Sequence, residues 1–270
     1  VQVFLGGGVP EVMLHLRAAG LQRTEARTVS GRTLGENLDW WERSERRARL
    51  RARLRELDGI EADDVIMSPA AARARGLTST ITFLRGNLAP EGAVVKSTAI
   101  APELVGADGV FVHRGPARVF TSEAAAIAAV KAGRLQAGDV LVLIGIGPGS
   151  GMPETYQITS ALKHLREGRR IALVTDGRFS GVSTGACIGH VSPDAWSGGP
   201  IGRVRDGDQI DLRIDTRALT GEVNVAGLPE AELAARGIHP ALKPDPRVPA
   251  DTRLWAALQG VSGGTWGGCV

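Results

Sequence analysis

Apolar and polar positions follow two different periods along the chain. Up to about residue 60, apolar residues recur every three or four positions, as they do on one face of a helix. The first predicted helix spans residues 11–19 and ends at Gly20, and a turn-rich link over 28–35 follows it. A second, arginine-rich helix is predicted from Glu42 onward, because its leucines repeat at helical spacing.

From about Ile60 the pattern changes to short β-type runs separated by Gly and Pro. Strands are predicted over residues 81–84, 93–96, 109–113, 117–120, 139–144, 170–175, 201–204, 209–214 and 222–225. Helices are predicted over 122–132, which Ser122 caps, and over 154–165. The tail from Glu230 is predicted to be helical in two pieces that prolines separate.

Many short strands with few helices between them predict a mixed α/β fold, in which a swivelling, β-barrel-like domain is flanked by helices. A regular alternation of strands and helices is absent from the pattern. A complete Rossmann or TIM-barrel architecture is therefore not expected.

Composition narrows the class of protein. Of the 270 residues, 43% are apolar, enough for a buried core, and the 36 glycines favour tight turns and backbone-lined sites over a helical bundle. Aromatic residues make up only 4%, which weighs against base stacking on single-stranded nucleic acid. Two cysteines, Cys187 and Cys269, have no metal-like spacing, so we expect no disulfide framework and a reducing cytoplasm. No apolar run is long enough to span a bilayer.

The net charge of +3 is modest, but seven arginines lie between Glu42 and Glu56. Basic helices bind phosphates, so a nucleic-acid partner is one interpretation. Glutamates interleave with the arginines, however, and this arrangement is more typical of a solvated helix face. We therefore expect no nucleic-acid partner.

A glycine-rich segment over residues 145–154 lies between a predicted buried strand and a predicted helix. Glycines let backbone N–H groups approach a ligand, and a helix N-terminus favours anions. The segment lacks the Lys-Ser/Thr of a P-loop and the glycine spacing of a dinucleotide fingerprint. Glu154, at the start of the helix, either compensates the helix dipole or is a ligand for a hard cation such as Mg²⁺.

Ser180 follows a predicted strand, in a turn where a hydroxyl can face a cleft. Its surroundings are not those of a nucleophile elbow, so on the residues alone it is a turn residue more than a catalyst. His190 is either a hydrogen-bonded core residue or a group that supports the site from behind. Cys187 is either a cluster ligand or a small buried hydrophobe.

Several polar residues lie beside rigid turns or close to Ser180. Asn87, Lys96 and Arg118 are candidates for holding a substrate carboxylate, for which Arg is well shaped. Their alternative role is to fix the geometry of their turns. Thr184 is a further candidate for contact with a substrate.

Six motifs occur in a fixed order along the chain: TLGEN (33–37), GNLAP (86–90), GPARVF (115–120), GMPE (151–154), DGRFSG (176–181) and GHVSP (189–193). From about Gly6 to Gly227, the chain resembles the dihydroxy-acid dehydratase/6-phosphogluconate dehydratase family. Further runs, such as ETYQ at 154–157 and FSGVSTGAC at 179–187, resemble its xylonate dehydratase branch. The arginine-rich helix is then expected to be an insertion with a structural role.

The resemblance implies a hydro-lyase that removes water from a 2,3-dihydroxy sugar acid, with D-xylonate as the leading substrate, to give a 2-keto-3-deoxy acid. In this family Mg²⁺ holds the substrate, a serine takes the proton from C2, and the 3-hydroxyl leaves toward a [2Fe–2S] cluster. Matching the motifs makes Ser180 the base and Glu154 a Mg²⁺ ligand. The resemblance implies that the cluster cysteines lie in an N-terminal domain, which we expect to precede Val1, so neither Cys187 nor Cys269 is expected to bind the cluster.

The resemblance also implies three parts in the chain. Residues 1–58 would complete an N-terminal α/β domain and carry the arginine-rich helix, 59–228 would form the barrel-like domain, and 229–270 a truncated helical tail. We expect the chain to be inactive alone and the complete protein to be a dimer or tetramer. The alternatives are a branched-chain dihydroxy-acid dehydratase and a non-catalytic remnant that binds small anions through residues 145–151.

Overall fold

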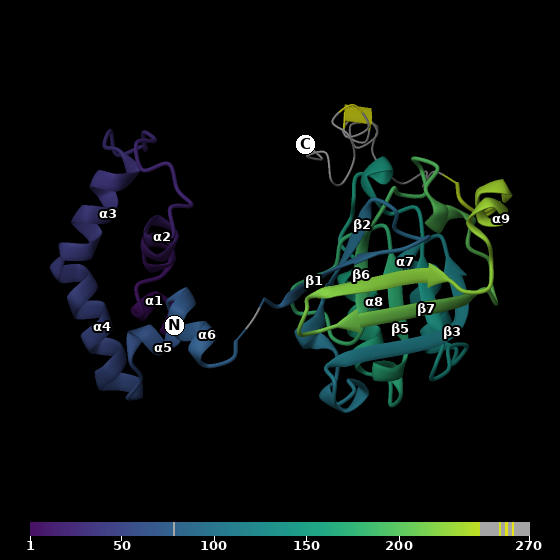
Figure 1. Cartoon of the computed structure of the whole chain (residues 1–270), viewed down its shortest axis with the longest axis horizontal. Helices are drawn as coiled ribbons and strands as arrows, with labels where there is room; N and C mark the ends of the chain where they lie inside the picture. Colours follow the sequence, from purple (N-terminus) through teal and green to yellow (C-terminus); the bar gives the residue numbers. More distant parts are fainter. Residues whose placement is uncertain (78, 244–253, 255–256, 259–260, 262–270) are drawn as a thin grey trace. The chain divides into compact units, whose positions relative to one another are not determined.

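The computed structural model describes residues 1–77, 79–243, 254, 257–258 and 261. The chain divides into two compact units, Val1–Thr78 and Ser79–Val270. The described part of the first unit is helical, and the second is built around a β-barrel (Figure 1). The division falls near residue 78 rather than at 58–59 because the helices over 62–74 belong to the first unit, where Ala62 is buried with Leu54.

The helices described in the first unit are α1 Gln2–Leu5, α2 Val9–Ala18, α3 Leu34–Arg43, α4 Glu45–Asp58, α5 Ala62–Val65 and α6 Pro69–Ala74. Thr33 begins α3 with a capping box, in which its hydroxyl accepts from the backbone of Glu36 (3.2 Å) and its own N–H donates to the Glu36 carboxylate (2.7 Å). Ser44 ends α3 and caps α4. The pattern predicts a link and one helix here, but the cap at Ser44 divides the segment into two helices.

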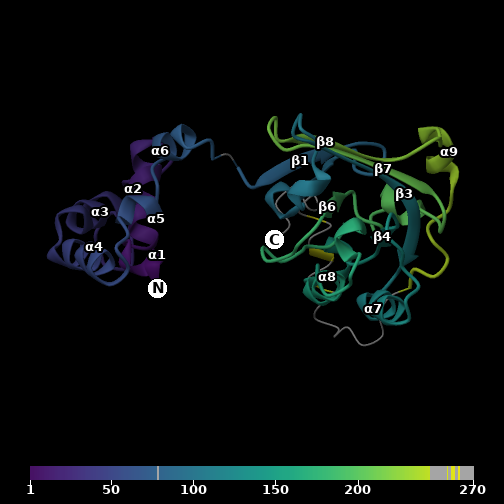
Figure 2. The same ribbon diagram turned by 90° about the horizontal axis from the view of Figure 1, so that it is seen from below.

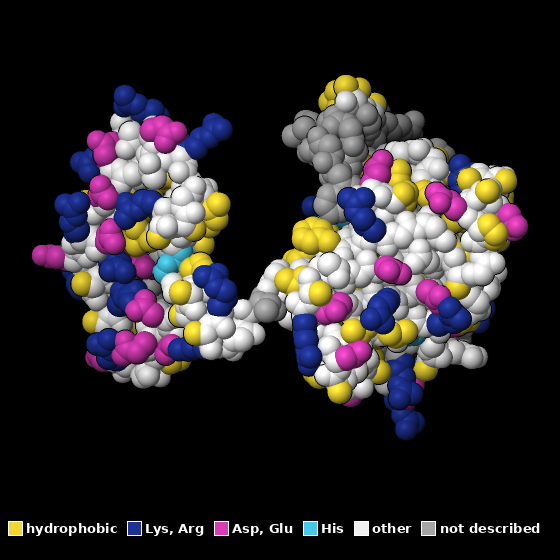
Figure 3. All heavy atoms as spheres, in the orientation of Figure 1, with side chains coloured by type: hydrophobic (Ala, Val, Ile, Leu, Met, Phe, Trp, Pro, Cys, Tyr) yellow, Lys and Arg dark blue, Asp and Glu magenta, His cyan; other side chains and the backbone are white. Residues whose placement is uncertain are grey.

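Arginines of α4 bind acidic residues of the same unit. Glu11 of α2 is 3% exposed, and it accepts hydrogen bonds from Arg47 at 2.5 and 3.1 Å and from the Trp41 indole at 3.1 Å. Burial raises the pKa of Glu11, but the hydrogen bonds and charge of Arg47 outweigh it and lower the pKa below its usual value. Acidic and basic side chains are interspersed over the surface of this unit (Figure 3). These contacts give the arginine-rich helix a structural role.

The strands of the second unit curve around a barrel (Figure 2). Their order in the closed barrel is β1-β2-β6-β5-β4-β3-β7-β8. The strands are β1 Ile81–Arg85, β2 Gly92–Lys96, β3 Val110–Phe120, β4 Val140–Leu143, β5 Ala172–Thr175, β6 Cys187–Ser192, β7 Gln209–Asp215 and β8 Thr220–Val225. Neighbours from β3 through β6 run parallel, the pair of β1 and β8 closes the barrel in parallel, and the other pairs are antiparallel.

Strands that helices cover are buried along their whole length, whereas strands with one face open to solvent are buried at alternate positions. Helix α7 Glu123–Lys131 connects β3 to β4, helix α8 Tyr156–Lys163 connects β4 to β5, and every residue of β4 and β5 is buried. Alternate residues of these strands face the barrel interior and the layer under the helices, as Val142 and Leu141 do. Strand β7 instead alternates between buried and more exposed positions, as expected for a sheet with one wet face. The described tail begins with α9 Glu230–Ala235.

The predicted mixed α/β barrel with flanking helices is confirmed, with three local differences. Residues 109–113 and 117–120 form one strand, because Gly115 lets the chain pass a neighbouring backbone: a Cβ there would lie 1.8 Å from the Gly138 carbonyl oxygen. The strand predicted over 201–204 is wrong, since a 3-10 helix spans Pro200–Arg203. Strand β6 was not predicted. The second helical piece predicted in the tail lies outside the described elements, and no described helix is long and apolar enough to cross a membrane.

Candidate active site

Two loops emerge together at one end of the barrel. Strands β4 and β5 are parallel neighbours, with Leu143 opposite Thr175 at their carboxyl ends. The loop over 144–155 follows β4 and carries Glu154, and the loop over 176–186 follows β5 and carries Ser180. The carboxyl ends of parallel strands are where α/β proteins place their ligands.

The structure brings the segments of Glu154 and Ser180 side by side. Glu154 pairs with Arg178 in an isolated parallel bridge. The backbone N–H and the side-chain hydroxyl of Thr155 both donate to the Arg178 carbonyl oxygen, at 3.0 and 2.8 Å. Glu154 is exposed and Ser180 is half-buried, so both can be reached from outside. The backbone contact was not predictable from either motif alone.

Lys96 and Thr184 also lie at the Ser180 loop. The Lys96 ammonium group, at the end of β2, donates a hydrogen bond of 2.5 Å to the carbonyl oxygen of Gly181, the residue after Ser180. Thr184 is an exposed residue of the same loop, and the next residue, Gly185, donates to the Ala99 carbonyl oxygen at 2.8 Å. The structure therefore binds a positively charged group to the backbone of the residue that follows the predicted base.

Asp176 joins three loops at this end of the barrel and was missed as a separate candidate. It is completely buried, and its carboxylate accepts from the backbone N–H groups of Gly145 (2.9 Å), Ile146 (3.0 Å) and Ala195 (3.0 Å). Burial outweighs these hydrogen bonds and raises its pKa to about 6, and the charge of Asp194 adds to the effect. A signal was present in the sequence, since an Asp directly after a buried strand must find partners.

The glycine-rich loop packs tightly against its neighbours. A Cβ at Gly147 would lie 2.6 Å from Asp194, and one at Gly149 would lie 2.4 Å from Trp196. The Trp196 indole donates to the Gly145 carbonyl oxygen at 2.9 Å. Close approach therefore explains these glycines, and the Asp176 carboxylate already binds the first N–H groups of the loop.

His190 supports the start of the Ser180 loop. Its backbone N–H donates to the Gly177 carbonyl oxygen at 2.9 Å, and its half-buried ring meets the ring of Phe179 edge-on, with centroids 6.2 Å apart. Burial and the positive charge of Arg178 lower the pKa of His190, so its neutral form is favoured. A Cβ at Gly189 would lie 2.4 Å from Phe179, which requires glycine there.

Asn87 and Arg118 are held by contacts within the barrel. The Asn87 side chain donates to the Val225 carbonyl oxygen at 3.0 Å and accepts from the Val225 N–H at 2.7 Å. Arg118 of β3 forms an ion pair of 3.2 Å with the buried Asp139, which precedes the amino end of β4. Neither residue is joined to the Ser180 loop by a hydrogen bond among the described residues.

The family resemblance implies two metal groups, a [2Fe–2S] cluster and Mg²⁺, and the described residues fit them differently. Among the described residues, no set of three or more His, Cys, Asp and Glu side chains is placed to hold a metal ion. Cys187 is buried in the layer beneath α7 and α8, and burial raises the pKa of its thiol, so it does not fit an iron–sulfur cluster. The exposed Glu154 carboxylate fits Mg²⁺, which is often held by one or two carboxylates together with water and substrate oxygens.

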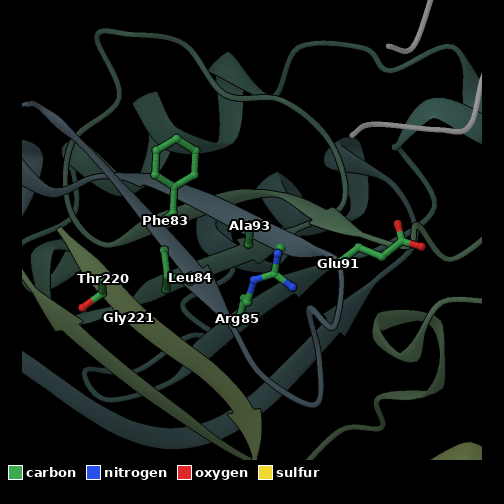
Figure 4. Close-up of a pocket in the computed structure, with 8 residues that line it drawn as sticks. Phe83, Leu84, Arg85, Glu91, Ala93, Thr220 and Gly221 are labelled. Carbon is green, nitrogen blue, oxygen red and sulfur yellow. The ribbon is translucent and has the colours of Figure 1, made fainter. Parts of the chain in front are cut away.

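A shallow pocket lies elsewhere, on β1, β2 and β8 (Figure 4). Its lining residues are Phe83, Leu84, Arg85, Glu91, Gly92, Ala93, Thr220 and Gly221. The charged groups in it have partners in their own surroundings, since Arg85 donates to the Pro90 carbonyl oxygen at 3.1 Å and Glu91 accepts from Ser192 at 2.6 Å. None of the predicted site residues lines this pocket.

The barrel and its loops belong to a family of dehydratases. Residues 64–260 match the family described as dihydroxy-acid/6-phosphogluconate dehydratase C-terminal, and the chain is a member of it. The D-xylonate dehydratases YjhG and YagF of Escherichia coli (strain K12) are 58% and 59% identical to the chain over its whole length, and the match covers 43% of each relative. A dihydroxy-acid dehydratase of Nitratidesulfovibrio vulgaris (strain DP4) is 45% identical over 85% of the chain and 37% of its own length. The chain thus spans less than half the length of these relatives.

Proposed function

We propose that the chain carries the base and one Mg²⁺ ligand of a hydro-lyase. The enzyme converts a 2,3-dihydroxy sugar acid into a 2-keto-3-deoxy acid, and D-xylonate is the leading substrate. The observation that carries the proposal is the pairing of the Glu154 segment with the Ser180 loop at the carboxyl ends of β4 and β5. The high identity to two D-xylonate dehydratases supports this choice of substrate.

Ser180 takes the proton from C2 of the substrate, and loss of the 3-hydroxyl group as water leaves an enol that rearranges to the 2-keto acid. A serine hydroxyl becomes a useful base only where nearby positive charge stabilises its alkoxide. Lys96, hydrogen-bonded one residue away, supplies such a charge.

Glu154 would hold Mg²⁺, which when bound supplies a Lewis acid for the carboxylate and 2-hydroxyl oxygens of the substrate. The described cysteine does not fit a [2Fe–2S] cluster, so we assign no step of the reaction to one in this chain.

Among the candidates for substrate contact, Lys96 and Thr184 lie on or against the Ser180 loop. The contacts of Asn87 and Arg118 favour structural roles, in which they tie β8 and β4 to the rest of the barrel. His190 holds the start of the Ser180 loop through its backbone hydrogen bond to Gly177, and we assign it no direct contact with the substrate.

We further propose a cytoplasmic, homo-oligomeric protein whose partner is a small sugar acid. Exposed apolar side chains at helical spacing on α2 (Val9, Val12 and Leu16) support an interface in the complete protein. A branched-chain dihydroxy acid is the alternative substrate, which the names of the more distant relatives support. An anion-binding remnant is disfavoured because Asp176 already binds the N–H groups of Gly145 and Ile146.

The test is formation of a 2-keto-3-deoxy acid from xylonate by the complete, anaerobically prepared gene product in the presence of Mg²⁺. Ser180→Ala should lower kcat by about 100-fold or more, because it removes the base. Ser79→Ala is the matched control, since that exposed hydroxyl donates to the carbonyl oxygen of Ile81 and accepts from its N–H, and forms no hydrogen bond with the described residues of the Ser180 loop. Equal activity of the Ser180→Ala variant and the wild type would refute the assignment of the base. Activity on branched-chain dihydroxy acids alone would refute the choice of xylonate.

A further inference from the structure

Two buried hydroxyl groups connect helix α8 to the loop that carries Ser180. The Ser183 hydroxyl donates to the Thr159 hydroxyl at 3.1 Å, and the Thr159 hydroxyl donates to the Tyr156 carbonyl oxygen at 2.9 Å. Thr159 is 2% exposed and Ser183 is 4% exposed. Neither residue belongs to the base, the metal ligand or the candidates for substrate contact.

The direction of this hydrogen-bond chain is fixed by chemistry. A carbonyl oxygen can only accept, so the single hydroxyl proton of Thr159 goes to Tyr156. Ser183 must therefore donate to Thr159, and each hydroxyl has one defined rotamer. Because both groups are buried, breaking the chain leaves a polar atom without a partner.

These contacts flank Ser180 on both sides. Before Ser180, the Arg178 carbonyl oxygen accepts from the backbone and hydroxyl of Thr155, the residue that follows Glu154. After Ser180, Ser183 is tied to Thr159 of α8, and its N–H donates to the Ser180 carbonyl oxygen at 2.9 Å. The helix that begins directly behind Glu154 thus holds the Ser180 loop at two points.

The loop leaves the barrel strands between the end of β5 at Thr175 and the start of β6 at Cys187. Apart from the Lys96 side chain of β2, which donates to the Gly181 carbonyl oxygen, the strands hold it near its ends. A loop of that length samples many conformations unless side chains restrain it. We propose that Thr159 and Ser183 are positioning residues, whose hydrogen bond sets the place of the Ser180 hydroxyl relative to the Glu154 carboxylate. This inference rests on the function proposed above for Ser180 and Glu154.

The experiment compares single and double variants of the complete gene product. Thr159→Val keeps the shape but removes the hydroxyl, Thr159→Ser keeps the hydroxyl, and Ser183→Ala removes the donor with the smallest change in volume. Thr216→Val is the matched control: its hydroxyl also donates to a carbonyl oxygen, that of Gly109 at 2.8 Å, beside β3 and β7. Steady-state kinetics with xylonate, binding of Mn²⁺ in place of Mg²⁺, and thermal unfolding are measured for each.

Thr159→Val and Ser183→Ala should each lower kcat roughly 10- to 100-fold, because misplacing a reacting group by about 1 Å can cost about 100-fold. Thr159→Ser should restore kcat to within about threefold of the wild type, and the Thr159→Val/Ser183→Ala double variant should lose no more than the worse single one. Mn²⁺ should bind as in the wild type, because Glu154 itself is unchanged. Thr216→Val should shift the unfolding temperature without this loss of kcat.

Two results would overturn the inference while leaving the proposed function intact. One is a folded Ser183→Ala variant with the kcat of the wild type. The other is a loss of kcat in Thr159→Val that adds in full to that of Ser183→Ala, because independent effects exclude a shared hydrogen bond. If Thr159→Val does not fold, Ser183→Ala and Thr159→Ser decide alone. A wild type inactive on every sugar acid would instead refute the proposed function and this inference with it.

Discussion

At the residue scale, Asp176 shows how a buried carboxylate makes stability depend on pH. Its folded-state pKa of about 6 lies above the ordinary value of 3.8, so the folded chain binds the proton more tightly than the unfolded chain. The stabilisation is complete below about pH 4 and is lost as the pH rises through 6, with a size of roughly 3 kcal/mol for a shift of about two pKa units.

We therefore expect the free energy of unfolding of the wild type to fall between about pH 4 and pH 6.5 relative to that of Asp176→Asn. Asparagine cannot titrate, and although it accepts fewer of the three N–H groups, that loss is the same at every pH. Urea denaturation of both proteins across this range measures the difference. Asp63→Asn, which removes an exposed carboxylate that pairs with Arg51 in the helical unit, is the matched control. Parallel curves for Asp176→Asn and the wild type would show that Asp176 is ionised throughout.

At the element scale, the contact between α2 and α4 depends on Glu11. Glu11→Ala should cost about 2 kcal/mol or more, because it leaves the Arg47 guanidinium and the Trp41 N–H without their buried acceptor. Arg53→Ala is the comparison, because Arg53 and Glu56 form an exposed pair that should contribute less than about 1 kcal/mol. Amide hydrogen exchange in α4 measures both losses, and equal exchange rates in the two variants would contradict this ranking.

Elements were predictable from the sequence where local pattern decides them. The run of β4 is apolar throughout and that of β5 is apolar up to Val174, and Ser122 marks the start of α7, so both types of element were found. Strand β6 was missed because a glycine and a histidine interrupt its pattern, while its burial comes from pairing with β2 and β5. Strand order cannot be read from periodicity, because pairs such as β2 with β6 join segments far apart in the chain.

In the candidate site too, residues within a motif were predictable, whereas contacts between segments far apart in the chain were not. Motifs predicted Glu154 and Ser180 by resemblance, but their pairing through Thr155 and Arg178 appears only once two loops meet. Thr159 and Ser183 could not be recognised, because a buried hydroxyl has no sequence pattern when its partner is 24 residues away. Arg118 had the chemistry of a carboxylate binder, but the structure gives it an acidic partner inside the chain, Asp139.

At the scale of the whole molecule, the barrel is closed by its own strands, and its two apolar clusters consist of residues from the second unit. The covering helices α7 and α8 belong to the same unit. A closed barrel has no free sheet edge through which a fragment would aggregate. The barrel unit therefore has what an independently folding domain needs.

We expect a fragment that begins at Ser79 to fold cooperatively without the helical unit, giving dispersed amide resonances and one sharp unfolding transition. A fragment that begins at Ala107 is the matched control. It lacks β1 and β2, so β6 and β8 each lose one of their two neighbouring strands and the barrel opens. Leu84 and Val95 are also lost from the core, and this fragment should be molten or insoluble. If the longer fragment also lacked a cooperative transition, the barrel would depend on residues before Ser79, and the two units would fold as one.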